Sequence, residues 1–317
     1  MDIPRIPRPR AATLLIIFAL LFLSTGIFIS ADVRPASAEV KVGNSLIDVS
    51  FADGALDLPQ SDVLAWVTTA ARAVAAYYGR FPVAHARLRI FPAAGRSGVF
   101  HGTTWGSDIP FTRISLGQHT SAAELDADWM MTHELIHIAF PQMADEHHWI
   151  EEGISTYVEP IARVQLGTLG PAQIWADMVR EMPNGEPDSG DRGLDHAHSW
   201  GRTYWGGAMF CLVADARIRE QTRSRKGLQD ALRGILNAGG TIQFDWPIEK
   251  AFQAGDQATG THVLAELYAQ MKDAPVTVDL AAMWKQLGVV SQGRTVAFDE
   301  TAPLAAVRRA ITAPPSE

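Results

Sequence analysis

The stretch MTHELIHIAFPQMADEHHWIEEGISTYVEP, residues 131–160, concentrates histidine and glutamate in two segments of helical pattern. His133 and His137 are four residues apart, so an α-helix places them about 40° apart on one face and one turn from each other. Two imidazoles in this arrangement reach one metal ion at the ~2.0–2.1 Å that zinc requires. Glu134 points to the side of that face, where it can take a proton from a water molecule beside the ion. The pattern therefore predicts a zinc site on this helix.

The two histidines need a further partner, because a catalytic zinc site usually has three protein ligands and an open position. A third histidine at the spacing His-Glu-x-x-His-x-x-Gly-x-x-His is excluded, since Phe140 and Met143 occupy the last two defined positions of that motif. An acidic residue from the following segment is the other option. That segment provides Glu151 and Glu152, and the residues by themselves leave both open.

The two motifs together resemble the gluzincin zinc metallopeptidases, most closely the aminopeptidase N-like members of the peptidase MA superfamily. In that family the second motif reads Trp-Leu-x-Glu-Gly-Phe-Ala-x-Tyr-x-Glu, and here Trp149-Ile-Glu-Glu152-Gly-Ile-Ser-Thr-Tyr-Val-Glu159 follows the His-Glu-x-x-His segment. The resemblance implies that His133, His137 and Glu152 hold one zinc ion, and that Glu151 is a solvated carboxylate at the start of a helix. Glu159 either orients a ligand histidine or is an ordinary exposed glutamate.

A second segment, Arg202-Thr-Tyr204-Trp-Gly-Gly-Ala-Met-Phe-Cys211, resembles the Tyr-x-Lys-Gly-Ala segment of the same family. There the tyrosine hydroxyl stabilises the tetrahedral oxyanion, which implies that Tyr204 is catalytic beside Glu134. Gly206 replaces the family's lysine, and the alternative is that Tyr204 begins a helix and buries its ring. The Gly-x-Met-Glu-Asn segment that binds a free amino end is missing. Its region holds Gly102-Thr-Thr-Trp-Gly106, so aminopeptidase specificity is not implied.

The resemblance implies an exported zinc-dependent metallopeptidase that acts on a peptide or protein substrate. Glu134 would activate the attacking water and return its proton to the leaving amine. One alternative is a peptide-binding protein without activity on the same scaffold, although a purely structural zinc site has no need for a base at Glu134. Another is a hydrolase of a non-peptide amide in the cell envelope.

The remaining histidines near these motifs have no recognisable spacing. His147 and His148 lie in the loop before Trp149, where they either line the site or are solvated. His101, His196 and His198 are interpreted in the same way, as residues near the site without an assigned role.

The hydrophobic pattern predicts an α+β fold. It consists of a small mixed sheet subdomain over residues 39–120 and a mainly helical subdomain over 121–317 of the same catalytic domain. The resemblance adds a thermolysin-like architecture with the zinc site in the cleft between the two. Strands are expected at 46–51, 86–91 and 111–116, helices at 58–78, 171–182, 203–221, 227–237, 246–254, 261–272 and 278–287, and a last strand at 293–298.

Three predictions concern the surroundings of the site. A capping box at Ser121 is expected to start a helix that runs to about Ala139. Pro160 should kink or shorten the helix that begins near Trp149. The strand 111–116 is either the sheet edge along which an extended peptide lies or an ordinary core strand.

The first 38 residues have the features of a signal peptide. Three arginines precede the apolar run Leu14–Ile29, and Pro35-Ala-Ser-Ala38 supplies a cleavage pattern, with cleavage expected after Ala38. The mature protein would be periplasmic or extracellular, and an uncleaved membrane anchor is the alternative.

Removing the four arginines and two aspartates of residues 1–38 changes the formal charge from −8 to −8 − 4 + 2 = −10. Such an acidic domain lacks the basic stripe that nucleic acids require. The lone Cys211, in an apolar run, is expected to be a buried thiol.

Overall fold

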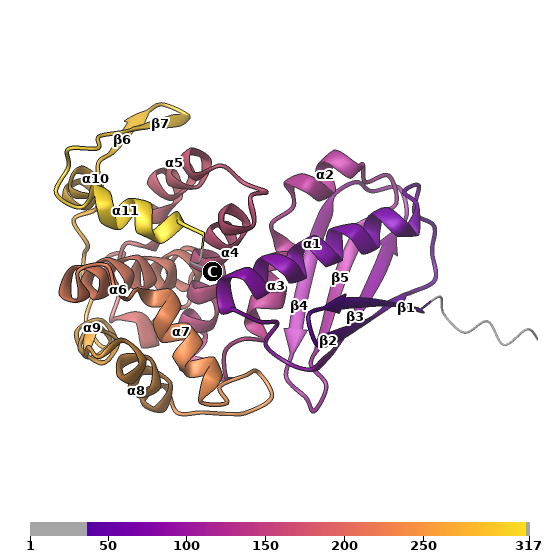
Figure 1. The fold of residues 1–317 in the computed structure, drawn as a ribbon, viewed down its shortest axis with the longest axis horizontal. Coiled ribbons are helices and arrows are strands. Elements are labelled where there is room, and N and C mark those ends of the chain that lie inside the picture. Colours follow the sequence, from indigo (N-terminus) through magenta and orange to yellow (C-terminus); the bar gives the residue numbers. More distant parts are fainter. Residues whose placement is uncertain (1–36, 315–317) are drawn as a thin grey trace, which may run out of the picture. The chain divides into compact units, whose positions relative to one another are not determined.

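The computed structural model describes residues 37–314 (Figure 1). The predicted signal peptide lies outside these residues, apart from Ser37 and Ala38. Among the helices of the described range, none is both long enough and apolar enough to cross a membrane.

A five-stranded mixed sheet forms the first part of the described chain (Figure 1). Its order is β1-β2-β3-β5-β4, in which β2, β3 and β5 run parallel while β1 and β4 pair antiparallel at the two edges. The strands are β1 (Ser37–Val42), β2 (Ser45–Phe51), β3 (His85–Ala93), β4 (Val99–Trp105) and β5 (Phe111–Gly117). The mixed sheet and the helices that follow it confirm the predicted α+β class.

The strand predicted at 111–116 lies inside the sheet, because β5 pairs with β3 on one side and with β4 on the other. The interpretation of this strand as the sheet edge is therefore wrong, and the core-strand alternative is right. The edge beside the helix that carries His133 and His137 is β4, which no sequence pattern predicted. Its seven residues show no alternation of buried and exposed side chains, so the two-residue period that marks a strand is missing.

Helices cover one face of the sheet. In β3 the side chains of Ala86, Leu88 and Ile90 are buried, while Arg87 and Arg89 between them are exposed. Helix α1 (Gln60–Tyr78) packs against β1 and against α3 (Met130–His137), the helix that carries His133 and His137. This arrangement fixes α3 between the sheet and the rest of the helices.

The helix predicted from Ser121 to about Ala139 consists of two helices, α2 (Ala122–Ala127) and α3 (Met130–His137). The capping box forms as predicted: the Ser121 hydroxyl accepts from the Glu124 N–H, and the Glu124 carboxylate accepts from the Ser121 N–H. The interruption has a local cause. The side chain of Asp128 accepts hydrogen bonds from the backbone N–H groups of Met130 and Met131, which starts a second helix at that point.

Helix α4 (His148–Leu166) carries the second motif and continues past Pro160, so the predicted shortening is wrong. A proline inside a helix removes one hydrogen bond, at a cost of about 3 kcal/mol. Helix α4 packs against α1, α3 and the later helix α6 (Gly207–Thr222), and this tertiary packing offsets the loss.

The remaining chain is mainly helical, as predicted, with a small hairpin near its end (Figure 1). Cys211 is buried in α6. The segment 183–198 contains short helical turns, and the last helix and the first hairpin strand were not predicted. The elements are α5 (Pro171–Glu181), α6 (Gly207–Thr222), α7 (Leu228–Asn237), α8 (Ile248–Thr259), α9 (Val263–Met271), α10 (Leu280–Leu287), β6 (Val289–Gln292), β7 (Thr295–Phe298) and α11 (Ala305–Thr312).

Candidate metal centre

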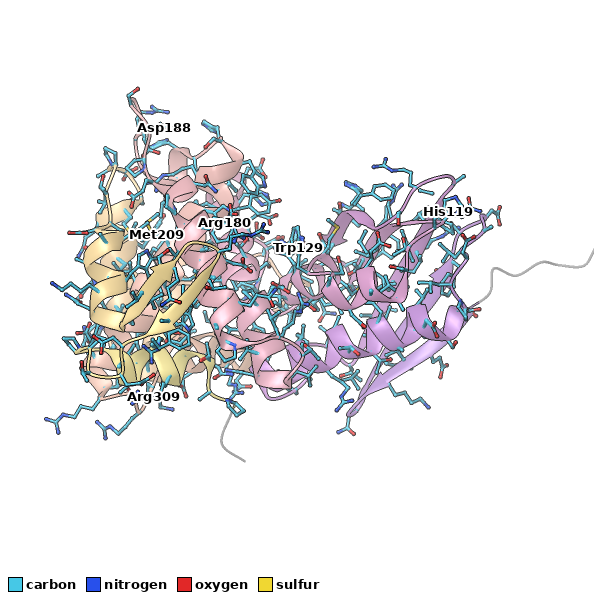
Figure 2. The ribbon with its side chains drawn as sticks, turned by 90° about the horizontal axis from the view of Figure 1, so that it is seen from above. His119, Trp129, Arg180, Asp188, Met209 and Arg309 are labelled. Carbon is cyan, nitrogen blue, oxygen red and sulfur yellow. The ribbon has the colours of Figure 1, made fainter. Side chains whose placement is uncertain are left out.

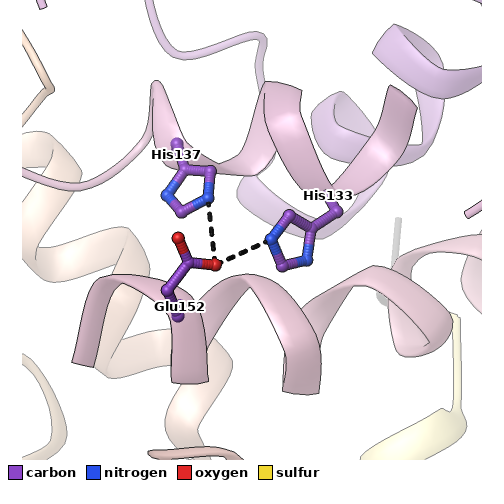
Figure 3. A group of neighbouring side chains, drawn as sticks. All are labelled: His133, His137 and Glu152. Carbon is purple, nitrogen blue, oxygen red and sulfur yellow. Dashed lines mark hydrogen bonds and ion pairs between the residues drawn. The ribbon is translucent and has the colours of Figure 1, made fainter. Parts of the chain in front are cut away.

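Helices α3 and α4 bring together the three residues that the sequence assigns to the metal (Figure 3). Nε2 of His133 lies 3.0 Å from Oε2 of Glu152, and Nε2 of His137 lies 3.6 Å from the same oxygen. One ligand atom from each residue lies within 4.8 Å of the other two. Of the two glutamates that the residues alone left open, Glu152 is the one in this group.

The three side chains fit a zinc ion. Tetrahedral zinc with bonds of ~2.0–2.1 Å separates its ligand atoms by about 3.3 Å, and the two separations from Glu152 are close to this value. The side chains of His133 and Glu152 are only 4% and 9% exposed. Burying a carboxylate beside two imidazoles is unfavourable unless the charges are compensated, which a bound cation would do. The donor set of two histidines and one glutamate is one that catalytic zinc sites use.

The electrostatics of the group suit a cation. Burial raises the pKa of Glu152, but the hydrogen bonds with His133 and His137 outweigh burial and hold the pKa well below its usual value. Burial lowers the pKa of His137, while the bond to Glu152 and the nearby carboxylates raise it to about 9. The carboxylate is therefore ionised, and a metal ion that binds here displaces a proton from the imidazole.

The edge strand β4 positions the side chain of Glu134. Oγ1 of Thr104 donates a hydrogen bond of 2.8 Å to Oε2 of Glu134. There is no room for a side chain at Gly102, because an added Cβ would lie 2.6 Å from Cγ and from Oε1 of Glu134. Glu134 thus lies outside the group of three ligand residues and is held by a different element. No sequence motif assigned a role to Thr104 or Gly102, although a glycine within a strand is a signal of close approach by another group.

The contact with β4 leads to a prediction for Gly102→Ala. The added methyl group should displace the Glu134 carboxylate without touching the three ligand residues. Since a displacement of about 1 Å in a reacting group can reduce a rate about 10²-fold, kcat should fall by that order while zinc content stays unchanged. Gly170→Ala is the matched control, because a methyl group there meets nothing within 4 Å. Full activity of Gly102→Ala would show that Glu134 does not need its present position.

Tyr204 lies beside the metal centre, in a π-helical turn (Arg202–Gly206) that leads into α6. Its ring stacks on that of His133, with centroids 6.0 Å apart and an interplanar angle of 11°. The close approach depends on Gly153 and Gly207, since a Cβ on Gly153 would overlap the backbone of Gly207. Burial and the nearby charge of Glu152 raise the pKa of Tyr204. Its hydroxyl therefore stays protonated and can donate a hydrogen bond.

The neighbouring histidines differ in their surroundings. Nε2 of His148 lies 3.3 Å from Oε1 of Glu152, so His148 lines the site. His147 instead contacts Asp195, with Nδ1 3.1 Å from Oδ1, and it is not solvated. Glu151 accepts a hydrogen bond from the Met143 N–H at 3.2 Å, so it fastens the loop between α3 and α4 and is not simply a solvated carboxylate.

Other histidines stand apart from the three ligand residues. His196 pairs with Asp273 at 3.3 Å, while His101 and His198 are exposed.

Glu159 is buried and pairs with Arg163, whose Nη1 lies 3.0 Å from its Oε1. The interpretation as an ordinary exposed glutamate is therefore wrong. Its carboxylate contacts Arg163, and the guanidinium of Arg163 also donates to the carbonyl of Asp126. Burial raises the pKa of Glu159 to about 7, against the opposing effect of Arg163.

This pKa gives a prediction for stability against pH. The folded protein holds the Glu159 proton more tightly than the unfolded chain, so the bound proton stabilises the fold. This stabilisation is complete below about pH 4.5 and is lost as the pH rises through about 7. One pKa unit corresponds to about 1.4 kcal/mol, so Glu159→Gln should gain on the order of 1–3 kcal/mol relative to the parent between about pH 5 and about pH 8. Denaturant unfolding of both proteins measures this difference. A variant that instead loses relative stability over this range would show that the ion pair with Arg163 dominates.

Comparisons with known proteins find similar folds among solved structures. No known family profile matches the chain, and no curated protein matches it in sequence. An aminopeptidase N family protein from Idiomarina loihiensis superposes with a TM-score of 0.59 at 12% identity, covering 80% of this chain and 49% of the other. An M1 zinc metallopeptidase from Deinococcus radiodurans, solved as a variant bound to a Tyr-Ser-Ala substrate, gives 0.51 at 14% identity, covering 78% and 53%.

The chain spans about half the length of these two proteins. At such low identity the likeness establishes the fold alone. The described part of the chain has a fold like that of the M1 zinc metallopeptidases of the aminopeptidase N family.

Proposed function

We propose that the protein is a zinc-dependent metallopeptidase that hydrolyses peptide bonds with one zinc ion. The observation that carries the proposal is the arrangement of side chains around the group His133, His137 and Glu152. His133, His137 and Glu152 converge on one point, and Glu134 is held by β4 outside that group. A purely structural site has no use for a second buried carboxylate fixed in this way. When bound, zinc would act as a Lewis acid that polarises the carbonyl of the substrate and makes water more acidic.

The side chains of this chain account for the movement of the proton. Glu134 takes a proton from water as the water oxygen forms a bond to the carbonyl carbon of the peptide. The hydroxyl of Tyr204 donates a hydrogen bond to the developing oxyanion, as its protonated state allows. Glu134 then gives the proton to the amide nitrogen as the carbon–nitrogen bond breaks. The products are a carboxylic acid and an amine, and Glu134 returns to its starting state.

The path of the substrate follows the edge strand β4. This strand is at the end of the five-stranded sheet and holds Glu134 through Thr104. An extended peptide could pair with its free edge, with the scissile bond close to Glu134. A peptide on β4 replaces the expectation that the peptide lies along the strand 111–116. Binding along β4 also supports a site between the sheet and the helices.

The proposal includes export, which rests on the sequence of the first 38 residues. A basic start, an apolar run and a small-residue cleavage pattern are typical of a signal peptide. The substrate would therefore be a peptide or protein outside the cytoplasm, and the acidic mature chain argues against nucleic acid as a partner.

A peptide library provides the test. The purified protein should cleave a subset of a randomised library, with mass spectrometry identifying a carboxylate and an amine at each cut. A chelator should abolish cleavage. If peptides bind but none is cut in the presence of zinc, the chain is a binding protein. If peptides neither bind nor are cut while an envelope amide is hydrolysed, the chemistry stands and the substrate class is wrong.

A further inference from the structure

A cavity of about 310 Å³ lies against the metal centre. His133 and Tyr204 line it, so the cavity and the metal centre share two side chains. Three tryptophans complete its aromatic lining. Trp129 lies at the start of α3, Trp200 lies just before the π-helical turn, and Trp205 lies within that turn. A concave space of this kind, lined by aromatic rings and adjacent to reactive groups, is typical of a binding site for part of a substrate.

The rings form a continuous series from the metal centre to solvent. Tyr204 stacks on His133, and Trp200 stacks on Tyr204 with centroids 5.7 Å apart and an interplanar angle of 25°. Trp129 meets His133 edge to face at 5.3 Å. Trp129 and Trp200 are nevertheless 48% and 63% exposed. Large aromatic surface left open in a cavity is surface that a ligand can cover.

The charged groups of the cavity are paired with one another. Arg180 contacts Asp177 at 2.6 Å and Glu181 at 2.7 Å, and Glu159 contacts Arg163 at 3.0 Å. Figure 2 shows Arg180 close to Trp129 in that view, and both line the cavity. With three carboxylates and two guanidinium groups, each already in an ion pair, the cavity has no free charge to receive a charged side chain. Its excess of one carboxylate disfavours an acidic guest, and a basic guest would have to compete with Arg163 and Arg180 for carboxylates that are already paired.

We infer that this cavity is a specificity pocket, and that it accepts an uncharged aromatic side chain of the substrate at a residue flanking the scissile bond. The inference rests on the proposed function and names the class of substrate for it. Offset or edge-on contacts between aromatic rings contribute beyond the burial of apolar area, and Trp129 and Trp200 are exposed aromatic rings in the lining of the cavity. Phenylalanine, tyrosine or tryptophan at that residue should raise kcat/KM about 10–100-fold over alanine.

The test compares two exposed aromatic residues. Trp200→Ala removes the outermost ring of the pocket, and Phe244→Ala, at a residue that is 55% exposed and does not line the cavity, is the control. Both proteins and the parent are given a library randomised at the two residues that flank the scissile bond. The parent and Phe244→Ala should prefer aromatic residues at one of them. In Trp200→Ala the ratio of kcat/KM for aromatic peptides to that for alanine-bearing peptides should fall about 10-fold.

A binding measurement separates this inference from the proposed function. Calorimetry follows acetyl-Ala-Ala-X-Ala-Ala-amide, where X is Phe, Ala, Lys or Glu, binding to the Glu134→Gln variant with and without Trp200→Ala. Hydrolysis without aromatic preference, or a preference that Trp200→Ala leaves intact, overturns the pocket and leaves the peptidase standing. If no peptide is hydrolysed, the proposed peptidase activity is wrong, and the calorimetric affinities alone test the pocket. Binding of the Phe peptide at least about 10-fold tighter than the Ala peptide, and lost with Trp200→Ala, supports the pocket. Equal binding of the two peptides overturns it.

Discussion

Glu134→Gln should keep its zinc and its fold while peptide hydrolysis falls by about 10²–10⁴-fold. The substitution removes the base that takes the proton from water and the acid that returns it to the leaving amine. It leaves the three ligand residues untouched, since Glu134 is outside their group. The glutamine oxygen can still accept the hydrogen bond that Thr104 donates to Glu134. Zinc content, melting temperature and kcat for the best library peptide are the three measurements.

Glu146→Gln is the control for this substitution, because Glu146 is an exposed glutamate in the loop between α3 and α4. It removes the same charge without touching the metal centre and should retain full activity. A Glu134→Gln protein that cleaves peptides as fast as the parent would mean that another group activates the water, and the proposed role of Glu134 would be wrong.

Removal of a ligand should abolish both zinc binding and activity. Glu152→Ala or His137→Ala takes one of three donors from the site, and even residues that only orient a metal ligand are worth about 10–100-fold in metal affinity. A direct ligand should therefore cost at least about 100-fold, measured by competition with a chromophoric chelator and by elemental analysis.

Glu151→Ala is the matched substitution on the neighbouring residue. Glu151 accepts a hydrogen bond from the Met143 N–H, so its loss should loosen the loop before α4 but keep the zinc. Full zinc in Glu152→Ala together with loss of zinc in Glu151→Ala would transfer the third ligand to Glu151 and contradict the geometry.

The parts of the site that lie within single helices were accessible to sequence reasoning. His133 and His137 are fixed by helical periodicity, and the capping box at Ser121 is a local signal that the structure reproduces. The motif around Glu152 resembled a known pattern, which was needed to choose between two adjacent glutamates. Local periodicity cannot make that choice, because it does not show which face of α4 meets α3.

Contacts between distant segments were missed, although the family resemblance named Tyr204. Thr104 meets Glu134 across 30 residues of chain, and no local pattern in β4 marks it as a strand. The approach of Tyr204 depends on Gly153 and Gly207 in different helices, so only the packed structure shows why both are glycine. At Pro160 one of the two expected effects, a shortened helix, was wrong, because the packing of α4 overrode a local rule about helices.

The most direct test is to remove the metal with a chelator and titrate zinc back while measuring hydrolysis of the best library peptide. Activity should vanish in the metal-free protein and return in proportion to added zinc, reaching its maximum at about one ion per chain. Peptide hydrolysis that continues at the parent rate in fully zinc-free protein would contradict the assignment of His133, His137 and Glu152 to a catalytic zinc ion.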